Sequence, residues 1–545
     1  MSPRSRQAIL LFLTPILVAV LLMLPRLADP HFGFFDDPAT LRVAQQVSHG
    51  DWGAVLETAS GRARPLYWLY PAAVYALAGA SPFWSFFGNT VLLALVVAGV
   101  VALAHQLGAD RWEASLAGGL FVLSGPVIEN AYTLSKPELQ QLVWILLALL
   151  LALWAERSRG ARRVAAVGLA GLAVAAACNT KETAVLLLPI SLTWLGLGAA
   201  LRRFRVAVHA RGYLRDPSFL MACVLGLMVY VGLSSLYVNP GLLREGYGSG
   251  YQIELEKMLQ TARAWVDWLN RDFLYLVPLL VLAVLRLGRL RPRLSEAARW
   301  AGWLVLWFAL YLPWKFAPEY YLLPFAVGAA VLGALLVSVL RQVVVHEKGG
   351  WRAAAVAALV LSGLLFGLTL PNNYTNGRLQ LAIDSANAEM LDDVVEGAPP
   401  NAVVLLNHPE GGEYSVHFPS LVTEQGGRSD LTVAVFRSQD PKAEGWEGKT
   451  ILVVLPVFEN QFYPSVRLGV FAHDAARWNE GARAYLGAAA RPAFRATQRF
   501  RLFNVDAARL FCPAVPQLGY CAVPNTPFDG RLLEYGWEIY FLPPD

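Results

Sequence analysis

The sequence predicts a polytopic α-helical membrane protein with about eleven transmembrane helices and a C-terminal external α/β domain. Hydrophobic residues make up 56% of the 545 residues and charged residues only 16%, and the mean hydropathy is +0.43. The apolar residues fall in long runs, and a helical span needs about 20 mostly apolar residues. The predicted spans are residues 9–24, 83–103, 114–128, 139–153, 164–177, 184–201, 219–236, 273–285, 300–312, 320–340 and 353–370.

The distribution of basic residues predicts the orientation of these spans. Lys and Arg in short loops are retained on the cytoplasmic side, and every second loop of this chain is basic, with arginine clusters at 157–163, 202–215, 286–299 and 341–352. The short loops of the other parity, around Lys136, Lys181 and Lys315, carry one basic residue each. We therefore expect a cytoplasmic N-terminus, an external C-terminus, and a first segment that is retained as an anchor rather than cleaved.

The pI of about 8.9 reflects this asymmetry between loops. No clustered basic face with interleaved aromatic residues indicates a nucleic-acid partner.

The composition changes after residue 370, so we expect two domains, 1–370 in the membrane and 371–545 outside it. Short β-branched runs at 402–406, 431–436 and 450–457 predict strands, and 474–490 predicts a helix, which together favour a mixed α/β layer. Cys512 and Cys521 lie in this external part, where an oxidising compartment favours a disulfide over two unpaired thiols. Cys178 and Cys223 lie in or beside apolar spans and are expected to be buried thiols.

The first external loop, residues 29–82, contains two adjacent carboxylates, Asp36 and Asp37. Pro38 after Asp37 is a standard helix start, so Asp37 has a structural task as a cap for the N–H groups of the helix that follows. Apolar residues then recur on one face of that helix, which suits a position flat on the bilayer surface. Asp36 has no such structural explanation. A carboxylate beside another carboxylate at a low-dielectric boundary has a raised proton affinity, which suits a general base.

Basic residues of the external loops are the candidates for binding a phosphate. Arg62 and Arg64 precede the apolar stretch 66–77, which is too short to cross the membrane and is expected to be re-entrant or half-embedded. Lys136, Lys181 and Lys315 lie at the ends of spans. The alternative interpretation is that the arginines contact lipid headgroups and that the lysines snorkel to the headgroups or pair with nearby acids.

In chain order these features resemble the membrane-embedded glycosyltransferases of the GT-C fold, which include protein O-mannosyltransferases and aminoarabinose transferases. The resemblance covers roughly residues 8–370. It rests on the N-terminal span, Phe35-Asp36-Asp37, Arg64-Pro65-Leu66, Asn89 in the next span, and Lys181-Glu182 ahead of an apolar run that reaches Pro189.

The resemblance implies an integral enzyme of the bacterial inner (plasma) membrane that transfers a hexosyl or pentosyl group from a polyprenyl-phosphate donor. The acceptor would be a protein, a lipid or a glycan at the external, periplasmic face. Asp36 would be the base of an inverting displacement, and Asp37 would share that role, orient the acceptor or hold a divalent cation. The candidates for the donor phosphate are Arg62, Arg64, Lys136, Lys181 and Lys315.

Such an enzyme needs an apolar groove for the lipid, cations for the leaving phosphate and a base for the acceptor hydroxyl. Arg and Lys can stabilise a monophosphate without a metal, so Mg²⁺ or Mn²⁺ stays an open alternative, with Asp36 and Asp37 as its candidate ligands.

Two other classes of function stay open. A transporter or flippase of lipid-linked glycans would also have many spans, but its ionisable groups are expected near the bilayer midplane, often with an internal repeat. The other class is a non-catalytic protein of the same fold whose external domain binds a partner.

Overall fold

A computed structural model describes residues 3–34, 37–56, 64–203, 216–237, 251, 253–286, 293–314, 319–407, 413–436, 446, 448–458, 475–487, 491–501 and 532–544. Five of the candidate site and disulfide residues lie outside these ranges, so the predictions on them stay predictions. They are Asp36, Arg62, Lys315, Cys512 and Cys521.

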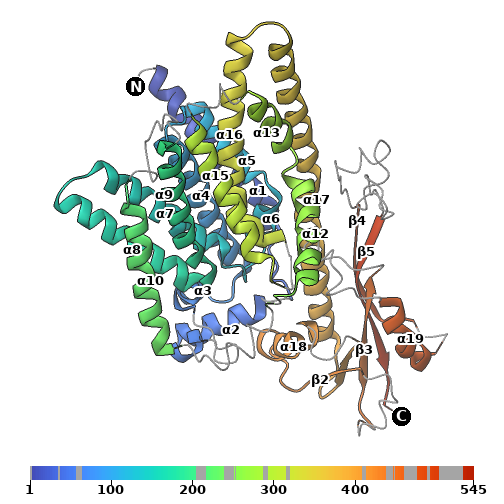
Figure 1. The fold of residues 1–545 in the computed structure, drawn as a ribbon. Coiled ribbons are helices and arrows are strands. Elements are labelled where there is room, and N and C mark those ends of the chain that lie inside the picture. Colours follow the sequence, from blue (N-terminus) through green and yellow to red (C-terminus); the bar gives the residue numbers. More distant parts are fainter. Residues whose placement is uncertain are drawn as a thin grey trace.

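Most of the described chain is a helical bundle (Figure 1). Its helices are α1 (Pro3–Ala28), α4 (Pro82–Gln106), α5 (Arg111–Val122), α6 (Gly125–Ala131), α7 (Glu138–Arg157), α8 (Ala161–Thr180), α9 (Leu187–Arg203), α10 (Ser218–Tyr237), α12 (Leu255–Asp272), α13 (Leu276–Leu285), α15 (Leu294–Tyr311), α16 (Leu323–His346) and α17 (Gly350–Gly397). Two short 3₁₀ turns, η2 (Glu182–Leu186) and η5 (Glu319–Leu322), precede α9 and α16.

All eleven predicted spans lie on helices, but not all of these helices have the length and hydropathy of a span. Within the described residues, eight helices are long and apolar enough to cross a membrane, or nine if α12 and α13, which are bent by 89°, form one broken span. The predicted span 114–128 is divided between α5 and α6, and 273–285 is mostly the ten-residue helix α13. The bundle is that of an integral membrane protein, and the number eleven stays a prediction.

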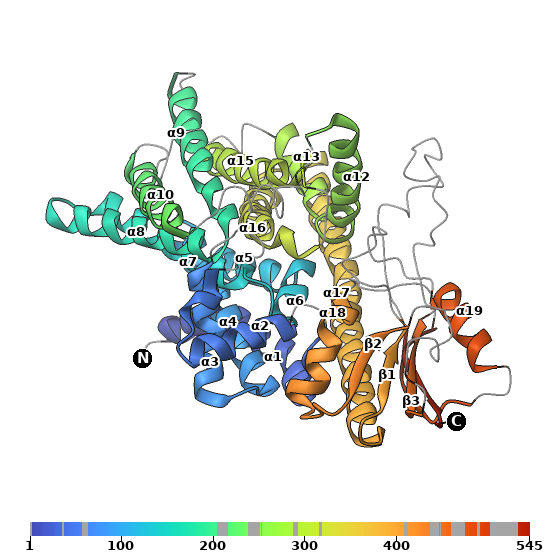
Figure 2. The same ribbon diagram turned by 90° about the horizontal axis from the view of Figure 1, so that it is seen from below.

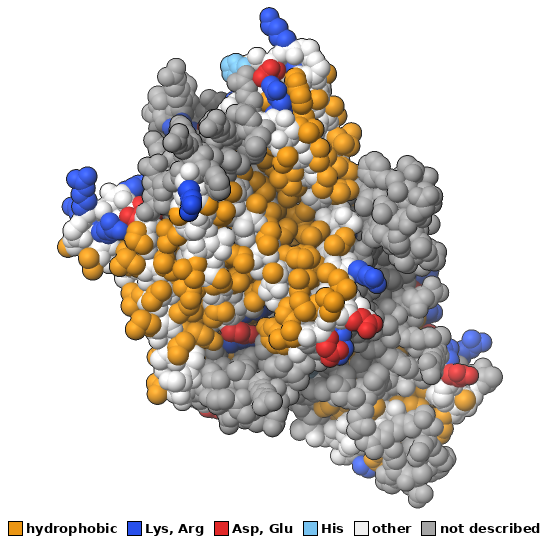
Figure 3. Space-filling model, in the orientation of Figure 1, with side chains coloured by type: hydrophobic (Ala, Val, Ile, Leu, Met, Phe, Trp, Pro, Cys, Tyr) orange, Lys and Arg blue, Asp and Glu red, His pale blue; other side chains and the backbone are white. Residues whose placement is uncertain are grey.

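The outer surface of the bundle is apolar in a broad band. Figure 3 shows hydrophobic side chains across the middle of one face, with charged side chains toward its edges. Exposed Met228 of α10, Val281 of α13, Val305 of α15 and Leu364 of α17 are among the residues that make the surface apolar. Lipid tails would cover such a band, because in a soluble protein so much exposed apolar surface would be unfavourable.

The contacts that charged side chains make between different loops form two sets, and these sets match the predicted sides of the membrane. Contacts among the loops predicted to be cytoplasmic are Arg157 with Gln106, Arg163 with Asp216, Arg286 with Glu347, and Arg293 with Glu113. Contacts among the loops predicted to be external are Arg64 with Glu182, Lys181 with Glu138, and Arg271 with Glu319. The alternation of loops in the sequence thus corresponds to two opposite ends of the bundle.

Two short helices cover the end that carries the predicted external loops. Helix α2 (Asp37–Ser48) begins at Asp37, and its buried Leu41, Ala44 and Val47 form the predicted apolar face. Helix α3 (Pro65–Ala78) begins with Pro65, because proline lacks the N–H that a first helical residue cannot pair. Val47 packs with Tyr67 and Trp68 of α3. Both helices predicted in the first external loop are therefore confirmed, but the apolar face of α2 is buried within the protein rather than open to the bilayer. The half-embedded position of α3 stays a prediction.

The C-terminal part contains a five-stranded mixed sheet in the order β2-β1-β3-β5-β4. The strands are β1 (Val403–Leu406), β2 (Thr432–Val435), β3 (Ile451–Phe458), β4 (Phe494–Arg501) and β5 (Leu532–Leu542). Strand β1 runs parallel to its neighbours β2 and β3, whereas β5 runs antiparallel to its neighbours β3 and β4. Helices α18 (Glu413–Ser420) and α19 (Ala475–Leu486) complete the described part of it. The three predicted strands are confirmed, and α19 confirms the predicted helix at 474–490 over residues 475–486.

Helix α17 joins the bundle to this sheet. It is continuous from Gly350 to Gly397 and therefore passes through the predicted domain boundary at 370/371. Seen from below, α18 lies beside α2, and the sheet stands next to the far end of α17 (Figure 2). The C-terminal part is thus attached at the same end of the bundle as the first external loop.

Candidate functional site

Asp37 is turned into the protein and holds the first external loop in place. Its Oδ2 accepts a hydrogen bond of 2.9 Å from the backbone N–H of Gly33, and its Oδ1 accepts one of 3.1 Å from the N–H of Leu134. The residue is only 3% exposed. Both of these bonds come from backbone groups outside α2, which the sequence did not indicate, and the predicted capping of α2 stays a prediction. Asp37 ties residues 29–37 of the first external loop, called the acid loop below, to the connection between α6 and α7.

The surroundings of Asp37 favour its protonated form. Burial raises the pKa of its carboxyl from 3.8 to about 6, with a further rise from nearby Asp384, against a lowering by the Gly33 N–H, Arg26 and the Leu134 N–H. A carboxylate removed from water loses solvation that its hydrogen bonds only partly replace. Asp37 therefore changes its charge close to neutral pH.

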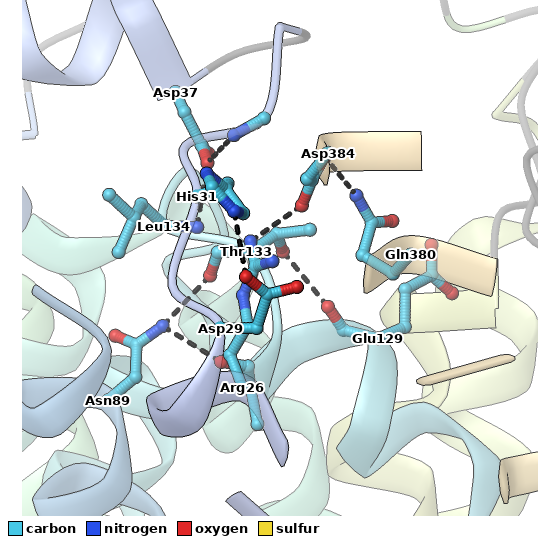
Figure 4. Close-up of polar contacts among 12 residues, drawn as sticks. Arg26, Asp29, His31, Asp37, Asn89, Glu129, Thr133, Leu134, Gln380 and Asp384 are labelled. Carbon is cyan, nitrogen blue, oxygen red and sulfur yellow. Dashed lines mark hydrogen bonds and ion pairs between the residues drawn. The ribbon is translucent and has the colours of Figure 1, made fainter. Parts of the chain in front are cut away.

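A buried ion pair lies beside Asp37, and sequence reasoning missed it. The guanidinium Nη2 of Arg26, at the end of α1, lies 2.6 Å from Oδ2 of Asp384 on α17, and both side chains are fully buried. Gln380, one turn earlier on α17, donates to the other oxygen of Asp384 at 3.0 Å (Figure 4). The one available signal was Arg26 itself, a basic residue at the external end of the first span, where the positive-inside pattern does not expect one.

Arg64, the first candidate for the donor phosphate, lies at the start of α3 and pairs with Glu182. Its Nε and Nη2 each lie 3.1 Å from one oxygen of that carboxylate. Such a two-bonded pair fixes the plane of the guanidinium. The pair brings the first external loop next to η2, the turn that Lys181 immediately precedes.

Lys181 and Lys136 lie against the two adjacent aromatic rings of η5. The Lys181 Nζ is 4.3 Å from the ring centre of Tyr321, and the Lys136 Nζ is 4.1 Å from that of Tyr320. Lys181 is buried and forms an ion pair with Glu138 at the start of α7. The acid that pairs with Lys181 is thus distant in sequence, rather than its neighbour Glu182.

The segment 131–136 connects the acid loop to these cations. Asn89 of α4 donates to the carbonyls of Ala131 and Thr133 at 3.1 and 2.9 Å (Figure 4), and Leu134 donates to Asp37. Lys136 follows two residues later. Asn89 therefore has a structural explanation, since its amide fixes the backbone between Asp37 and Lys136.

The structure thus brings together four of the predicted site residues at one end of the bundle. They are Asp37, Arg64, Lys136 and Lys181. The arrangement combines an acid loop with cations of fixed position beside aromatic rings, which suits the binding of an anionic group. Within the described ranges no group of three or more His, Cys, Asp or Glu side chains is placed to hold a metal ion.

No protein-family model matches this chain, and no curated protein matches it. Among solved structures, it is similar to ArnT from Cupriavidus metallidurans bound to undecaprenyl phosphate, at 14% identity and a TM-score of 0.48, over 81% of this chain and 92% of that one. The apo state of the same protein gives 13% identity and 0.48 over 83% and 93%. The Archaeoglobus fulgidus oligosaccharyltransferase with Zn and sulfate gives 14% and 0.46 over 81% and 68%. With TM-scores below 0.5, these likenesses identify no function for this chain.

Proposed function

We propose that the chain is an integral membrane glycosyltransferase that moves a sugar from a polyprenyl-phosphate donor to an acceptor at the external face, in a bacterial inner membrane. The observation that carries the proposal is the meeting of Arg64, Lys136 and Lys181 with the acid loop at one end of an apolar bundle. A lipid-linked donor would place its phosphate and sugar at this level while its chain stays beside the apolar helices.

In the proposed reaction, Asp36 accepts the proton of an acceptor hydroxyl while the hydroxyl oxygen attacks the anomeric carbon. The bond from that carbon to the phosphate oxygen breaks, and the electron pair leaves with the polyprenyl phosphate, so the configuration inverts. Asp37 has a supporting task, because both of its carboxylate oxygens hold backbone N–H groups. It fixes the loop in which Asp36 is the preceding residue, and positioning of this kind lowers the barrier of a displacement.

The cations would stabilise the leaving phosphate. Arg64 and Lys181 are each held by a carboxylate, Glu182 and Glu138, so their positions are fixed before the donor arrives. Preorganised charges of this kind stabilise a transition state without a cost of reorganisation when charge develops. A divalent cation held by Asp36 and Asp37 is the alternative use of the acid pair.

Detergent-solubilised protein tests this function against that of a flippase. Total lipid and envelope material from cells that lack the chain would be incubated with the purified protein, and polyprenyl phosphates measured by mass spectrometry. We expect one polyprenyl-phosphate sugar to fall and free polyprenyl phosphate to rise. A detergent micelle has no two sides to move a lipid between, so a flippase would release no polyprenyl phosphate. If folded protein releases no polyprenyl phosphate, the proposal is contradicted.

A further inference from the structure

The first external loop is held by the C-terminal part of the chain as well as by the bundle. Phe34, two residues before Asp36, is 3% exposed and belongs to the apolar core beneath the sheet. Its ring centre lies 6.1 Å from those of Tyr414 and Phe418, both on α18. The acid loop therefore inserts an aromatic side chain into the C-terminal domain, the part of the chain that follows α17.

Helix α17 lies close to the loop at a second point, Gly33. A methyl group added to Gly33 would lie 3.2 Å from Oδ1 of Asp384 and 3.3 Å from Oδ2 of Asp37. The backbone of the loop thus passes between one carboxylate of α17 and one carboxylate of α2. Figure 4 shows Asp384 and Asp37 coming from opposite sides of this segment.

The ion pair between Arg26 and Asp384 is expected to add little to the stability of the fold. Arg26 uses Nη2 for Asp384, stacks on the ring of Phe86 at 3.9 Å, and leaves Nε and Nη1 buried without a hydrogen-bond acceptor among the described residues. Buried pairs gain little stability over well-packed apolar residues, and unpaired buried donors cost free energy. What the pair does provide is a fixed carboxylate beside the acid loop.

Helix α17 is also hydrogen-bonded to the sheet at Asn387, one turn after Asp384. The side-chain carbonyl of Asn387 accepts hydrogen bonds from Trp537 Nε1 at 2.8 Å and from the Tyr535 hydroxyl at 3.1 Å, both on β5. The Tyr535 hydroxyl also lies 2.6 Å from that of Tyr414 on α18. A buried chain of contacts therefore runs from β5 through Asn387 to Asp384, and through Tyr414 to Phe34.

We propose that Asp384 and Arg26 are positioning residues for the acid loop, and that the C-terminal domain holds this loop in place through Phe34 and α17. The consequence for activity rests on the proposed function, whereas the mechanical link does not. The C-terminal domain and α17 are accordingly parts of the active site's scaffold, and α17 supplies Asp384, which lies outside the region that carries the acid pair.

Hydrogen–deuterium exchange of the full-length purified protein tests the mechanical link without an assay of activity. We expect Asp384→Asn and Phe34→Ala each to speed exchange in peptides covering residues 29–48 on the order of tenfold. Phe34 packs against α18, and Asp384 holds Arg26, three residues before the loop begins. The matched controls are Asp392→Asn, an exposed acid on the same helix, and Phe494→Ala, which trims the same core from β4. Both controls should leave residues 29–48 unchanged.

Peptides from β3 and β5 show whether a variant has damaged the C-terminal domain itself. If exchange in residues 29–48 rises only together with exchange in these strands, or if Phe494→Ala raises it as much as Phe34→Ala, the proposed link is wrong. Unchanged exchange in both test variants overturns it as well.

The kinetic test separates positioning from a general loss of folding. Asp384→Asn should lower kcat about tenfold or more with little change in the KM of the donor, because the donor phosphate binds at the separate cation site. Arg26→Lys should retain more kcat than Arg26→Met, since it keeps the charge beside Asp384. A rise in KM alone, or equal effects of the two Arg26 variants, would contradict the positioning role. If no variant or wild-type protein transfers sugar while the exchange results hold, only the proposed function fails.

Discussion

At the scale of single residues, the acid pair divides into two tasks. Asp37 is buried, and both of its oxygens are used by backbone N–H groups of Gly33 and Leu134. Asp37 thus links two loops by hydrogen bonds. Asp36 is therefore the residue proposed to act on the acceptor. The sequence indicated a structural task for Asp37 from the following proline, but its partner Leu134 is 97 positions away. No local pattern could predict that partner.

Asp37→Asn should remove a pH dependence of stability. Because the folded state raises the pKa of this carboxyl to about 6, the native protein binds its proton more tightly than the unfolded chain. Its contribution is therefore full below about pH 4, falls as the pH rises through about 6, and changes by on the order of 3 kcal/mol.

Thermal unfolding of both proteins in the same detergent at about pH 4.5 and about pH 7 measures this. The stability of the wild type relative to Asp37→Asn should decrease between the two pH values. An identical difference at both would show that Asp37 does not titrate in this range.

Gly33→Ala should impair the acid loop. The added methyl would lie 3.2 and 3.3 Å from two carboxylate oxygens, so Asp37 or Asp384 must move by a few tenths of an ångström. Overpacking of a buried site costs about 1–3 kcal/mol, and we expect transfer to fall on the order of tenfold because such displacements misalign the reacting groups. Gly119→Ala is the control, since its methyl would meet nothing within 4 Å. Equal activity of the two variants would show that the loop tolerates the shift.

At the scale of elements, the sequence predicted the helices and strands that have a clear local pattern. It missed the strands whose charged residues find their partners only in the assembled sheet. The spans, α2, α3 and the first three strands follow from hydropathy, proline positions and β-branched runs. Strand β4 was missed because Phe494, Ala496 and Phe500 are its only apolar residues, although their even spacing fits one face of a strand. Strand β5 was missed because Glu534, Gly536 and Glu538 interrupt its apolar run. Its Glu538 pairs with Arg483 of α19, and Glu534 with Arg495 of β4. Only the assembled sheet accounts for these charges.

The contact of α3 with η2 offers a test of the phosphate-binding prediction. Arg64→Glu and Glu182→Arg should each lower stability and activity, because each places like charges together. The double variant restores the opposite charges and should recover stability, but we expect transfer to stay low and the KM of the donor to stay at least about tenfold raised. Thermal unfolding and donor titration are the two measurements. Recovery of activity together with stability would show that Arg64 has only a structural role.

At the scale of the whole molecule, the alternation of basic loops predicted two opposite ends, and the contacts between loops agree with that division. What the sequence could not predict is how the C-terminal part is attached. Arg26 and Asp384 are 358 positions apart, and Phe34 packs against α18. Pairings of this kind arise only when the tertiary structure forms. The described part of the candidate site therefore draws on both predicted domains.

Cysteine labelling of intact cells tests which end faces outward. Asp51 and Arg159 are both exposed and lie in loops of opposite parity. We expect a membrane-impermeant maleimide to label Asp51→Cys directly and Arg159→Cys only after permeabilisation, because arginine-rich loops are retained in the cytoplasm. The wild type supplies the background of native thiols. The reverse labelling would invert the proposed orientation and place the acid loop in the cytoplasm.

The central claim is that Asp36 acts on an acceptor during sugar transfer from a lipid-phosphate donor. The most direct measurement is the release of polyprenyl phosphate by purified wild type, Asp36→Asn and Asp51→Asn, the last a matched change at an exposed acid in the same loop. We predict that Asp36→Asn lowers the rate by at least about 10²-fold with an unchanged unfolding temperature, since general base catalysis contributes this much, while Asp51→Asn keeps the wild-type rate. Asp36→Asn with a wild-type rate would contradict the account.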